Sequence, residues 1–526
     1  MEGFLGRIAA DAVLAADFAK LCDFGGRLQG SASAEAAFAW TLDRLQQVGP
    51  AANEAVPYAG WTCQRSVVAL PDGTALPHIA LFGSATTAPA GVTLDVLDLG
   101  RGAPSDVAAA GSAVRGRAVL LRHEYPFAPW TIHRRFKLAA AAEAGAAAAF
   151  MVQPEPGIGP VSGGANGVPM PCFGIGIETA QRIAGRRVHV ALEAKAAPAT
   201  TPTLVLDMPG GGSGRVVLSA HLDGHPLGES AMDNATGLAA VLALARAVAP
   251  DLPRLRRGLT VCVFGAEEWA LTGSKAWLAG LSAERRAAMR FNLNLDSIAG
   301  HPHLTALTSG FPALGGFVQQ AASAIGVDVA VHLPLMVNSD HANFAAHGIP
   351  ALRLIAGFDS PEGALRHLLT GADTRAVVPL GELKSATITA GAILWAALTA
   401  EDAALDALRD GAASAAGDRP RSFFRQTRTA FTPDDLTYRP ASWRCSASNA
   451  ASILPSTANP STTQAAWSFT PPASGQCAMP PMPPRHAAQS RTKPCQGSVI
   501  TKRGFSGQAS PPTNQSPPSA GLNPPS

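Results

Sequence analysis

The sequence predicts an α/β protein built on a mostly parallel, twisted sheet with helices on both faces. Two observations predict it. Between residues 203 and 399, short hydrophobic segments of strand character alternate with segments of helical apolar spacing, an order typical of a parallel sheet covered on both sides. In addition, 47% of the 526 residues are hydrophobic and 15% are charged, which is typical of a folded globular protein with more than one core.

The alternating region has a regular order of expected elements. The strands are 216–220, 259–264, 291–295, 327–333 and 351–355, and the helices are 236–248, 274–281, 314–325 and 381–398. Ligands of such sheets lie beyond the carboxyl ends of the strands. We therefore expect polar residues that follow these strands to lie close together although they are far apart in sequence.

The rest of the chain divides by composition and pattern. We place the boundaries at 1–84, 85–200, 201–400 and 401–526. The first segment has a helix over 34–48 and an extended stretch over 62–70, and it belongs with the alternating domain. The second is a compact mixed α+β unit, with strands at 92–99, 117–122, 149–152 and 188–192 and a helix at 136–148. The last is rich in Pro, Ser, Thr, Ala and Gln, so we expect a disordered C-terminal tail, because such a stretch buries too little apolar surface to order itself.

Composition excludes several classes of function. The net charge of +3 is small for this length and no long basic run occurs, so we expect no nucleic-acid partner. Seven cysteines without CxxC pairs argue against a thiolate zinc site and a disulfide framework. No apolar run reaches about 18 residues, which predicts no membrane partner. Residues 1–19 lack the pattern of a signal peptide, so we expect a cytoplasmic protein; the oligomeric state stays open.

Four short motifs carry the chemistry, and two of them come first. His221-x-Asp223 follows a strand, and residues two apart on an extended segment share a face, so Asp223 can fix the tautomer of His221 for metal binding. A strand-end hydrogen bond is the ordinary alternative. Asp233 stands where a helix should begin, so it either caps that helix or bridges two metal ions with its two oxygens.

The other motifs lie further along the chain. Glu267 and Glu268 follow a buried strand and precede Trp269, so one can bind metal while its neighbour faces a metal-bound water. Asp296 ends a strand, and Ser339-Asp340-His341 opens a short helix. His367 precedes Asp373-Thr374. Each residue has an ordinary structural reading, but buried carboxylates and imidazoles need a partner, and a divalent cation supplies one for all of them.

In this order, the motifs resemble metallopeptidase family 28, the co-catalytic zinc aminopeptidases of the aminopeptidase Y type. The resemblance runs from residues 26–31 to about residue 399 and implies a zinc-exopeptidase fold. Residues 85–200 look like the protease-associated domain often inserted there, on the basis of residues 116–121, Lys137 and residues 143–146. The tail falls outside the resemblance.

The resemblance implies roles for individual residues and two zinc ions per chain. His221 and Asp296 would bind one zinc, Glu268 and His367 the other, and Asp233 would bridge them. Glu267 would be the general base, and Asp223 would orient His221.

The sequence departs from the family pattern in two places. The family's final histidine stands closer to the Asp-Thr pair than His367 stands to Asp373, so His341 competes with it as fifth ligand. Trp269 replaces a glycine common after the paired glutamates, and with Asp340 and His341 it is expected to line the site.

The implied activity is removal of N-terminal residues from peptides by a zinc-dependent exopeptidase in which Glu267 moves a proton. Two alternatives stay open on the same fold. One is a single-zinc acyltransferase similar to glutaminyl cyclase, and the other is a non-catalytic binding protein. The zinc content per chain and an assay on N-terminal glutaminyl peptides separate them.

Overall fold

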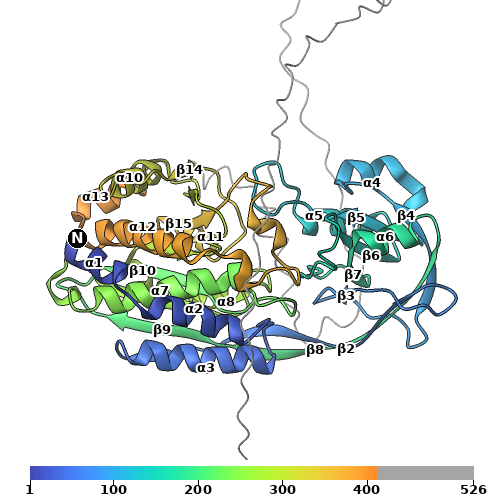
Figure 1. Ribbon diagram of the computed structural model, residues 1–526, viewed down its shortest axis with the longest axis horizontal. Helices are drawn as coiled ribbons and strands as arrows, with labels where there is room; N and C mark the ends of the chain where they lie inside the picture. Colours follow the sequence, from blue (N-terminus) through green and yellow to red (C-terminus); the bar gives the residue numbers. More distant parts are fainter. Residues whose placement is uncertain (411–526) are drawn as a thin grey trace, which may run out of the picture. The chain divides into compact units, whose positions relative to one another are not determined.

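The computed structural model describes residues 1–410, which contain two β-sheets (Figure 1). The first sheet has eight strands. Their order is β1 (Ala51–Asn53), β9 (Thr203–Met208), β11 (Gly258–Phe264), β10 (Arg215–His221), β12 (Met289–Leu295), β15 (Ala351–Ala356), β13 (Leu304–Leu307) and β14 (Ala330–His332). The four central strands β11, β10, β12 and β15 are parallel, and antiparallel pairs join β9 and β1 on one side and β13 on the other. The predicted fold class is confirmed.

The central strands are buried on both faces, as their continuous hydrophobic sequences require. Phe291 of β12 and Leu259 of β11 are both in register with Val216 of β10, so they share one face, where Phe291 packs on Phe317 of α10 (Pro312–Ser323) with ring centroids 5.7 Å apart. Phe264 lies five residues beyond Leu259 and therefore points to the other face. There it contacts α8 (Thr272–Gly280) and α11 (His341–Ala346).

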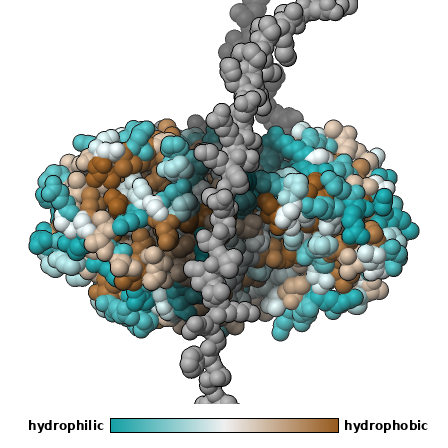
Figure 2. All heavy atoms as spheres, in the orientation of Figure 1, coloured by the Kyte–Doolittle hydropathy of each residue, from teal (hydrophilic) through white to brown (hydrophobic). Residues whose placement is uncertain are grey.

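Helices α7 (Thr236–Val248) and α12 (Leu380–Thr399) complete the cover of the sheet (Figure 1). The stretch Ala231–Val248, which contains α7, is long and apolar enough for a membrane span, but 94% of it is buried inside the protein. It is therefore a core helix. On the face drawn in Figure 2, hydrophilic side chains are spread among hydrophobic ones, as is usual for a globular surface.

Three helices precede the sheet: α1 (Glu2–Ala9), α2 (Val13–Asp23) and α3 (Ala32–Gln46). The sequence predicted only the third. Ser31 caps it, because its hydroxyl oxygen accepts a hydrogen bond from the Ala34 N–H at 3.2 Å. In α1, Phe4 stacks on Trp395 of α12 at 5.3 Å, so the N-terminal segment extends the hydrophobic core.

The second sheet has seven strands. Their order is β2 (Val56–Ala69), β8 (Arg187–Thr201), β4 (Val92–Asp98), β5 (Ala118–Arg122), β6 (Ala148–Gln153), β7 (Cys172–Gly176) and β3 (Ile79–Ala80). Strands β4 to β7 are parallel, and α4 (Pro104–Ala110), α5 (Arg134–Glu143) and α6 (Ile177–Ile183) accompany them. The sheet includes β2 and β3, which precede the expected start at residue 85. Its likeness to a protease-associated domain stays a prediction.

Two predicted boundaries are corrected. The helix expected over 136–148 ends at Glu143, because Gly145 adopts a positive φ of 85° that terminates the helix, and β6 begins at Ala148. The tail expected from residue 401 begins with α13 (Asp402–Ala407), where Leu405 and Leu408 are buried. The remainder of the predicted disordered segment, residues 411–526, lies outside the described residues.

Candidate metal centre

The polar residues that follow β10, β11 and β12 meet at one edge of the first sheet. His221, the last residue of β10, is in register with Phe264, the last residue of β11, and β12 ends at Leu295, next to Asp296. His221, Glu267 and Asp296 are 1%, 7% and 2% exposed. The sequence-based expectation that these side chains converge is thus realised by the parallel register.

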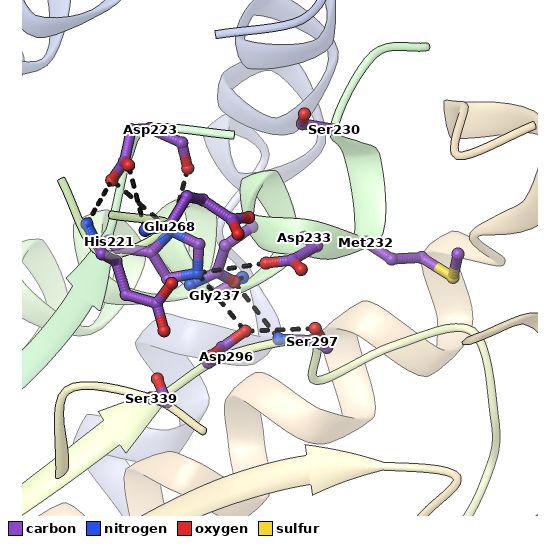
Figure 3. A network of polar contacts seen from close by, with 12 residues as sticks. His221, Asp223, Ser230, Met232, Asp233, Gly237, Glu268, Asp296, Ser297 and Ser339 are labelled. Atoms are coloured by element: carbon purple, nitrogen blue, oxygen red, sulfur yellow. Dashed lines mark hydrogen bonds and ion pairs between the residues drawn. The ribbon is translucent and has the colours of Figure 1, made fainter. Parts of the chain in front are cut away.

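His221 lies at the centre of the cluster (Figure 3). Its Nε2 is 3.1 Å from Asp233 Oδ1 and 3.5 Å from Asp296 Oδ1. Its Nδ1 is 2.9 Å from the backbone oxygen of Asp223, whereas the nearest carboxylate oxygen of Asp223 is 3.9 Å away. The carbonyl of Asp223 therefore accepts the Nδ1 hydrogen bond that leaves Nε2 as the donor for a metal. The predicted hydrogen bond from His221 to the side chain of Asp223 is therefore replaced by one to its main chain.

The carboxylate of Asp223 positions the paired glutamates instead. It accepts hydrogen bonds from the backbone N–H groups of Glu267 at 3.1 Å and Glu268 at 3.2 Å. Burial raises the pKa of Asp223 to about 7. The turn begins at Ala266, which has a φ of 55°, and it sends the two glutamate side chains to different partners.

The donor atoms form two groups that share His221. In one group, atoms of His221, Glu267 and Asp296 all lie within 4.8 Å of one another, and in the other, atoms of His221, Asp233 and Glu268 do. The predicted residues His221, Asp233, Glu267, Glu268 and Asp296 are therefore brought together by the fold.

The segment that carries Asp233 is held by two neighbours. The carboxylate of Asp373 accepts hydrogen bonds from the N–H groups of Met232 at 2.8 Å and Asp233 at 3.3 Å. Asn234 donates to the Leu295 carbonyl at 3.0 Å and accepts from Gly237 N–H at 3.0 Å. Since Asn234 serves the first turn of α7, the carboxylate of Asp233 is not used as a helix cap and faces His221.

The cluster carries more negative than positive charge. Burial and the neighbouring carboxylates Glu268, Asp340 and Asp296 raise the pKa of Glu267 well above its usual value. Burial, Glu268 and Asp296 also raise the pKa of Asp233. Within residues 1–410, His221 Nε2 and Glu268 Oε1 are buried and have no hydrogen-bond partner. These nitrogen and oxygen atoms can give lone pairs to a metal ion, and a cation would offset the excess negative charge. The cluster therefore fits a zinc ion, whose preferred ligands include imidazole and carboxylate.

Arg353 of β15 is a buried cation at the edge of this cluster. Its guanidinium is 3.0 Å from Asp296 Oδ1 and lies over the ring of Phe127, 4.4 Å from the centroid. Burial raises the pKa of Asp296, but Arg353 and His221 outweigh it, so the net pKa is lowered. Sequence reasoning missed Arg353, because a lone arginine inside a hydrophobic strand carries no spacing signal.

Of the other predicted site residues, Trp269 and Asp340 lie beside the cluster. Trp269 contacts Phe82 with ring centroids 4.5 Å apart. Asp340 accepts a hydrogen bond from Ser274 at 2.5 Å, and burial raises its pKa to about 6.

The two candidates for a fifth ligand do not join the donor groups found in residues 1–410. His367 is half-buried at the end of the short helix η4 (Ala364–His367). His341, the first residue of α11, is fully buried, and burial lowers its pKa to about 3.

A histidine that sequence reasoning did not select lies next to Glu268. His225 is 2% exposed, and its Nε2 is 2.7 Å from Glu268 Oε2. Its Nδ1 is 3.1 Å from the hydroxyl of Ser162, in the loop between β6 and β7. The signal was present in the sequence, because His221, Asp223 and His225 follow one another at intervals of two residues from the end of β10.

Comparison with known proteins agrees with this geometry. The sequence model described as Peptidase family M28 matches residues 203–387, the segment that contains every donor described above. Residues 203–387, which we call the M28 region, are therefore similar to peptidase family M28. This M28 region starts at β9 and extends into α12.

Curated relatives match this chain over limited lengths. The leupeptin-inactivating enzyme 1 of Streptomyces exfoliatus is 32% identical over 162 residues, which are 31% of this chain and 37% of the relative. Aminopeptidase YwaD of Bacillus subtilis is 28% identical over 169 residues, which are 29% of this chain and 36% of the relative. The chain thus matches about a third of the length of these relatives.

Solved structures show the same fold over a longer stretch. The zinc aminopeptidase BSAP from Bacillus subtilis has a TM-score of 0.61 at 20% identity, covering 74% of this chain and 95% of that one. A peptidase M28 precursor from Shewanella amazonensis has a TM-score of 0.64 at 19% identity, covering 76% and 96%. Because both likenesses extend beyond the M28 region, the fold they share includes the second sheet in part.

Proposed function

We propose that this protein is a zinc-dependent exopeptidase that removes N-terminal residues from peptides and holds two zinc ions per chain. The observation that carries the proposal is the pair of buried donor groups that share His221. The names of the relatives support it, since one is an aminopeptidase and a protein of similar fold is a zinc aminopeptidase. His221, Asp233, Glu268 and Asp296 would hold the metal.

Bound zinc would acidify a water molecule and polarise the carbonyl of the scissile peptide bond. The protein's own contribution is proton transfer by Glu267. This side chain is 7% exposed and lies in the donor group of His221 and Asp296, while its backbone N–H is held by Asp223. Glu267 takes a proton from the attacking water and returns it to the departing amine, a role that suits a carboxylate whose pKa is raised by its surroundings.

The first prediction tests this base. Glu267→Gln keeps the shape of the side chain but cannot accept the proton, so we expect the kcat for an aminoacyl substrate to fall by about 10²–10⁴ while the zinc content stays that of the wild type. The matched control is Glu284→Gln, which changes an exposed glutamate of α9 (Ala283–Ala288) and should leave kcat unchanged.

The substrates are chosen to separate the proposal from its rivals. Peptides with a free N-terminus should be cleaved, and the same peptides with an acetylated N-terminus should not. Near-normal turnover by Glu267→Gln would remove the assigned base. Cyclisation of glutaminyl peptides without hydrolysis, or a wild-type protein without zinc, would remove the proposed activity itself.

A further inference from the structure

His221, at the end of β10, and His225, four residues later, have similar surroundings. In His221, Nδ1 is engaged by the Asp223 carbonyl and Nε2 faces Asp233 and Asp296. In His225, Nδ1 is engaged by the Ser162 hydroxyl at 3.1 Å and Nε2 faces Glu268 at 2.7 Å. Both rings are buried, at 1% and 2% exposure. Each ring therefore has one nitrogen fixed by a hydrogen bond and the other directed at carboxylates.

The contact between His225 and Glu268 leaves polar atoms short of partners. His225 Nε2 and Glu268 Oε2 are 2.7 Å apart, which is an ion pair when the ring is protonated, but the geometry is poor for a hydrogen bond, and Glu268 Oε1 has no hydrogen-bond partner within the part of the chain that the structure describes. A buried polar atom without a partner is costly. A cation that accepts lone pairs from the imidazole and from the carboxylate removes both costs at once.

We propose that His225 supplies the second imidazole of the zinc centre, beside Glu268, and that His367 is not a ligand. This inference rests on the proposed zinc-dependent function. Bonds of zinc to imidazole nitrogen and carboxylate oxygen are about 2.0–2.2 Å long, so neighbouring donors around one ion lie about 3.4 Å apart in a tetrahedral arrangement. His225 Nε2 and Glu268 Oε2, now 2.7 Å apart, would reach that spacing by separating by about 0.7 Å.

The competing histidines are less suited to this role. Neither His225 nor His367 belongs to the two donor groups found in residues 1–410. His225, however, is buried against Glu268, whereas His367 is half-buried and forms no ion pair with a carboxylate of the cluster in that part of the chain. His341 is fully buried, but the guanidinium of Arg353 acts on it electrostatically and adds to the effect of burial in lowering its pKa.

Ser162 gives the inference a second consequence. Metal-binding histidines usually engage their other ring nitrogen in a hydrogen bond that fixes the ring, and Ser162 does this from the loop that joins β6 to β7 of the second sheet. The Ser162 N–H in turn donates to the Leu369 carbonyl at 2.7 Å, so the loop is anchored. The region of the second sheet thus holds a ligand of the metal centre in position.

The experiment measures zinc in the full-length wild type and in three variants, His225→Ala, Ser162→Ala and His367→Ala. Zinc per chain is determined by elemental analysis after dialysis, and affinity by competition with a chromophoric chelator. We expect His225→Ala to weaken the binding of one zinc ion by at least about 100-fold and Ser162→Ala by about 10–100-fold. His367→Ala is the matched control and should bind zinc like the wild type.

A spectroscopic readout complements the affinities. Replacement of zinc by Co²⁺ gives visible absorption bands that depend on the ligands, so the bands should change in His225→Ala and not in His367→Ala. Circular dichroism in the presence of a chelator checks that each variant is folded. If His225→Ala does not fold, Ser162→Ala keeps the imidazole and still decides the question.

The outcomes are distinct. Wild-type zinc affinity in His225→Ala, or in Ser162→Ala where that variant has to decide, overturns the proposal, and so does loss of zinc from His367→Ala. A wild-type protein that binds no zinc overturns the proposed function instead. Since the variants are judged relative to a wild type that binds zinc, the two failures cannot be confused.

Discussion

The two sheets place charged side chains beyond the ends of parallel strands in very different ways. At the end of β5, Glu124 is 8% exposed, but Lys137 contacts it at 2.5 Å and Arg101 at 2.8 Å. Lys137 also donates to two carbonyls at 2.8 Å. At the ends of β10 to β12, buried carboxylates gather around His221 without enough cations to balance them. Both sheets therefore place buried carboxylates beyond the ends of parallel strands. The candidate metal centre differs because the negative charge of its carboxylates is not balanced by neighbouring cations.

The largest effect that separates the two regions is expected for Lys137→Met. Removing the ammonium leaves the buried side chain of Glu124 with Arg101 and the Ile132 N–H as partners, and breaking a buried ion pair on one side costs about 3–5 kcal/mol. The free energy of unfolding, measured with urea on zinc-free protein, should fall by about 3 kcal/mol. Zinc affinity should not change, because this pair is separate from the donor groups.

The double variant Lys137→Met with Glu124→Gln is the control. It removes both charges, and similar replacements of whole buried pairs are often neutral, so it should recover most of the lost stability. A single variant as stable as the wild type would show that Glu124 is solvated and that the comparison between the sheets is wrong.

At the candidate metal centre, removal of a charged side chain should raise the free energy of unfolding instead of lowering it. In zinc-free protein, Glu267→Gln removes one of several mutually repelling buried carboxylates, so we expect the free energy of unfolding to rise by about 1 kcal/mol or more. The same substitution abolishes the proposed base, so activity and stability change in opposite directions. Urea unfolding in the presence of a chelator measures the effect.

The sign can be checked against pH. The pKa of Glu267 is raised above its usual 4.5, so the native state of the wild type holds this proton to higher pH than the unfolded state does, and its stability decreases as pH rises above 4.5. The advantage of Glu267→Gln should therefore be largest near pH 8 and shrink towards pH 4.5. An advantage that is independent of pH would point to packing as its cause.

The residues that the sequence could predict are those that follow long hydrophobic strands. His221, Glu267, Glu268 and Asp296 come directly after segments buried on both faces, and parallel register brings such positions together whatever their sequence separation. Asp233 was ambiguous between cap and ligand, because the choice depends on Asn234, whose side chain serves the first turn of α7.

What the sequence could not predict depends on contacts between distant segments. His225 repeats the two-residue spacing of His221 and Asp223 in the sequence, but its fixed orientation depends on the Ser162 hydroxyl, 63 residues away in sequence. Likewise, the second sheet extends before residue 85 because β2 pairs with β8 from Val56–Thr201 to Ala69–His189, and the pairing of two long strands far apart in the chain has no local signature. Helices α1 and α2 were missed because their burial depends on packing against α7 and α12.

The smallest expected effect is the loss of stability that Glu124 causes at acidic pH. Burial raises the pKa of Glu124, but hydrogen bonds from Arg101 and Lys137 outweigh it and lower the pKa to about 2 from the usual 4.5. A lowered carboxylate pKa contributes stability that is present above pH 4.5 and is lost as pH falls towards 2. In zinc-free protein, the wild type should therefore lose more stability than Glu124→Gln between pH 4.5 and 2, measured by urea unfolding at each pH. Glu267 should have the opposite effect, since it lowers the stability of the wild type as pH rises above 4.5. The pH dependence of unfolding therefore distinguishes Glu124, which is paired with cations, from Glu267, which is not. Parallel curves for wild type and Glu124→Gln would mean that the unfolded chain keeps the same pairing, and the contrast between the two sheets would then rest on the metal centre alone.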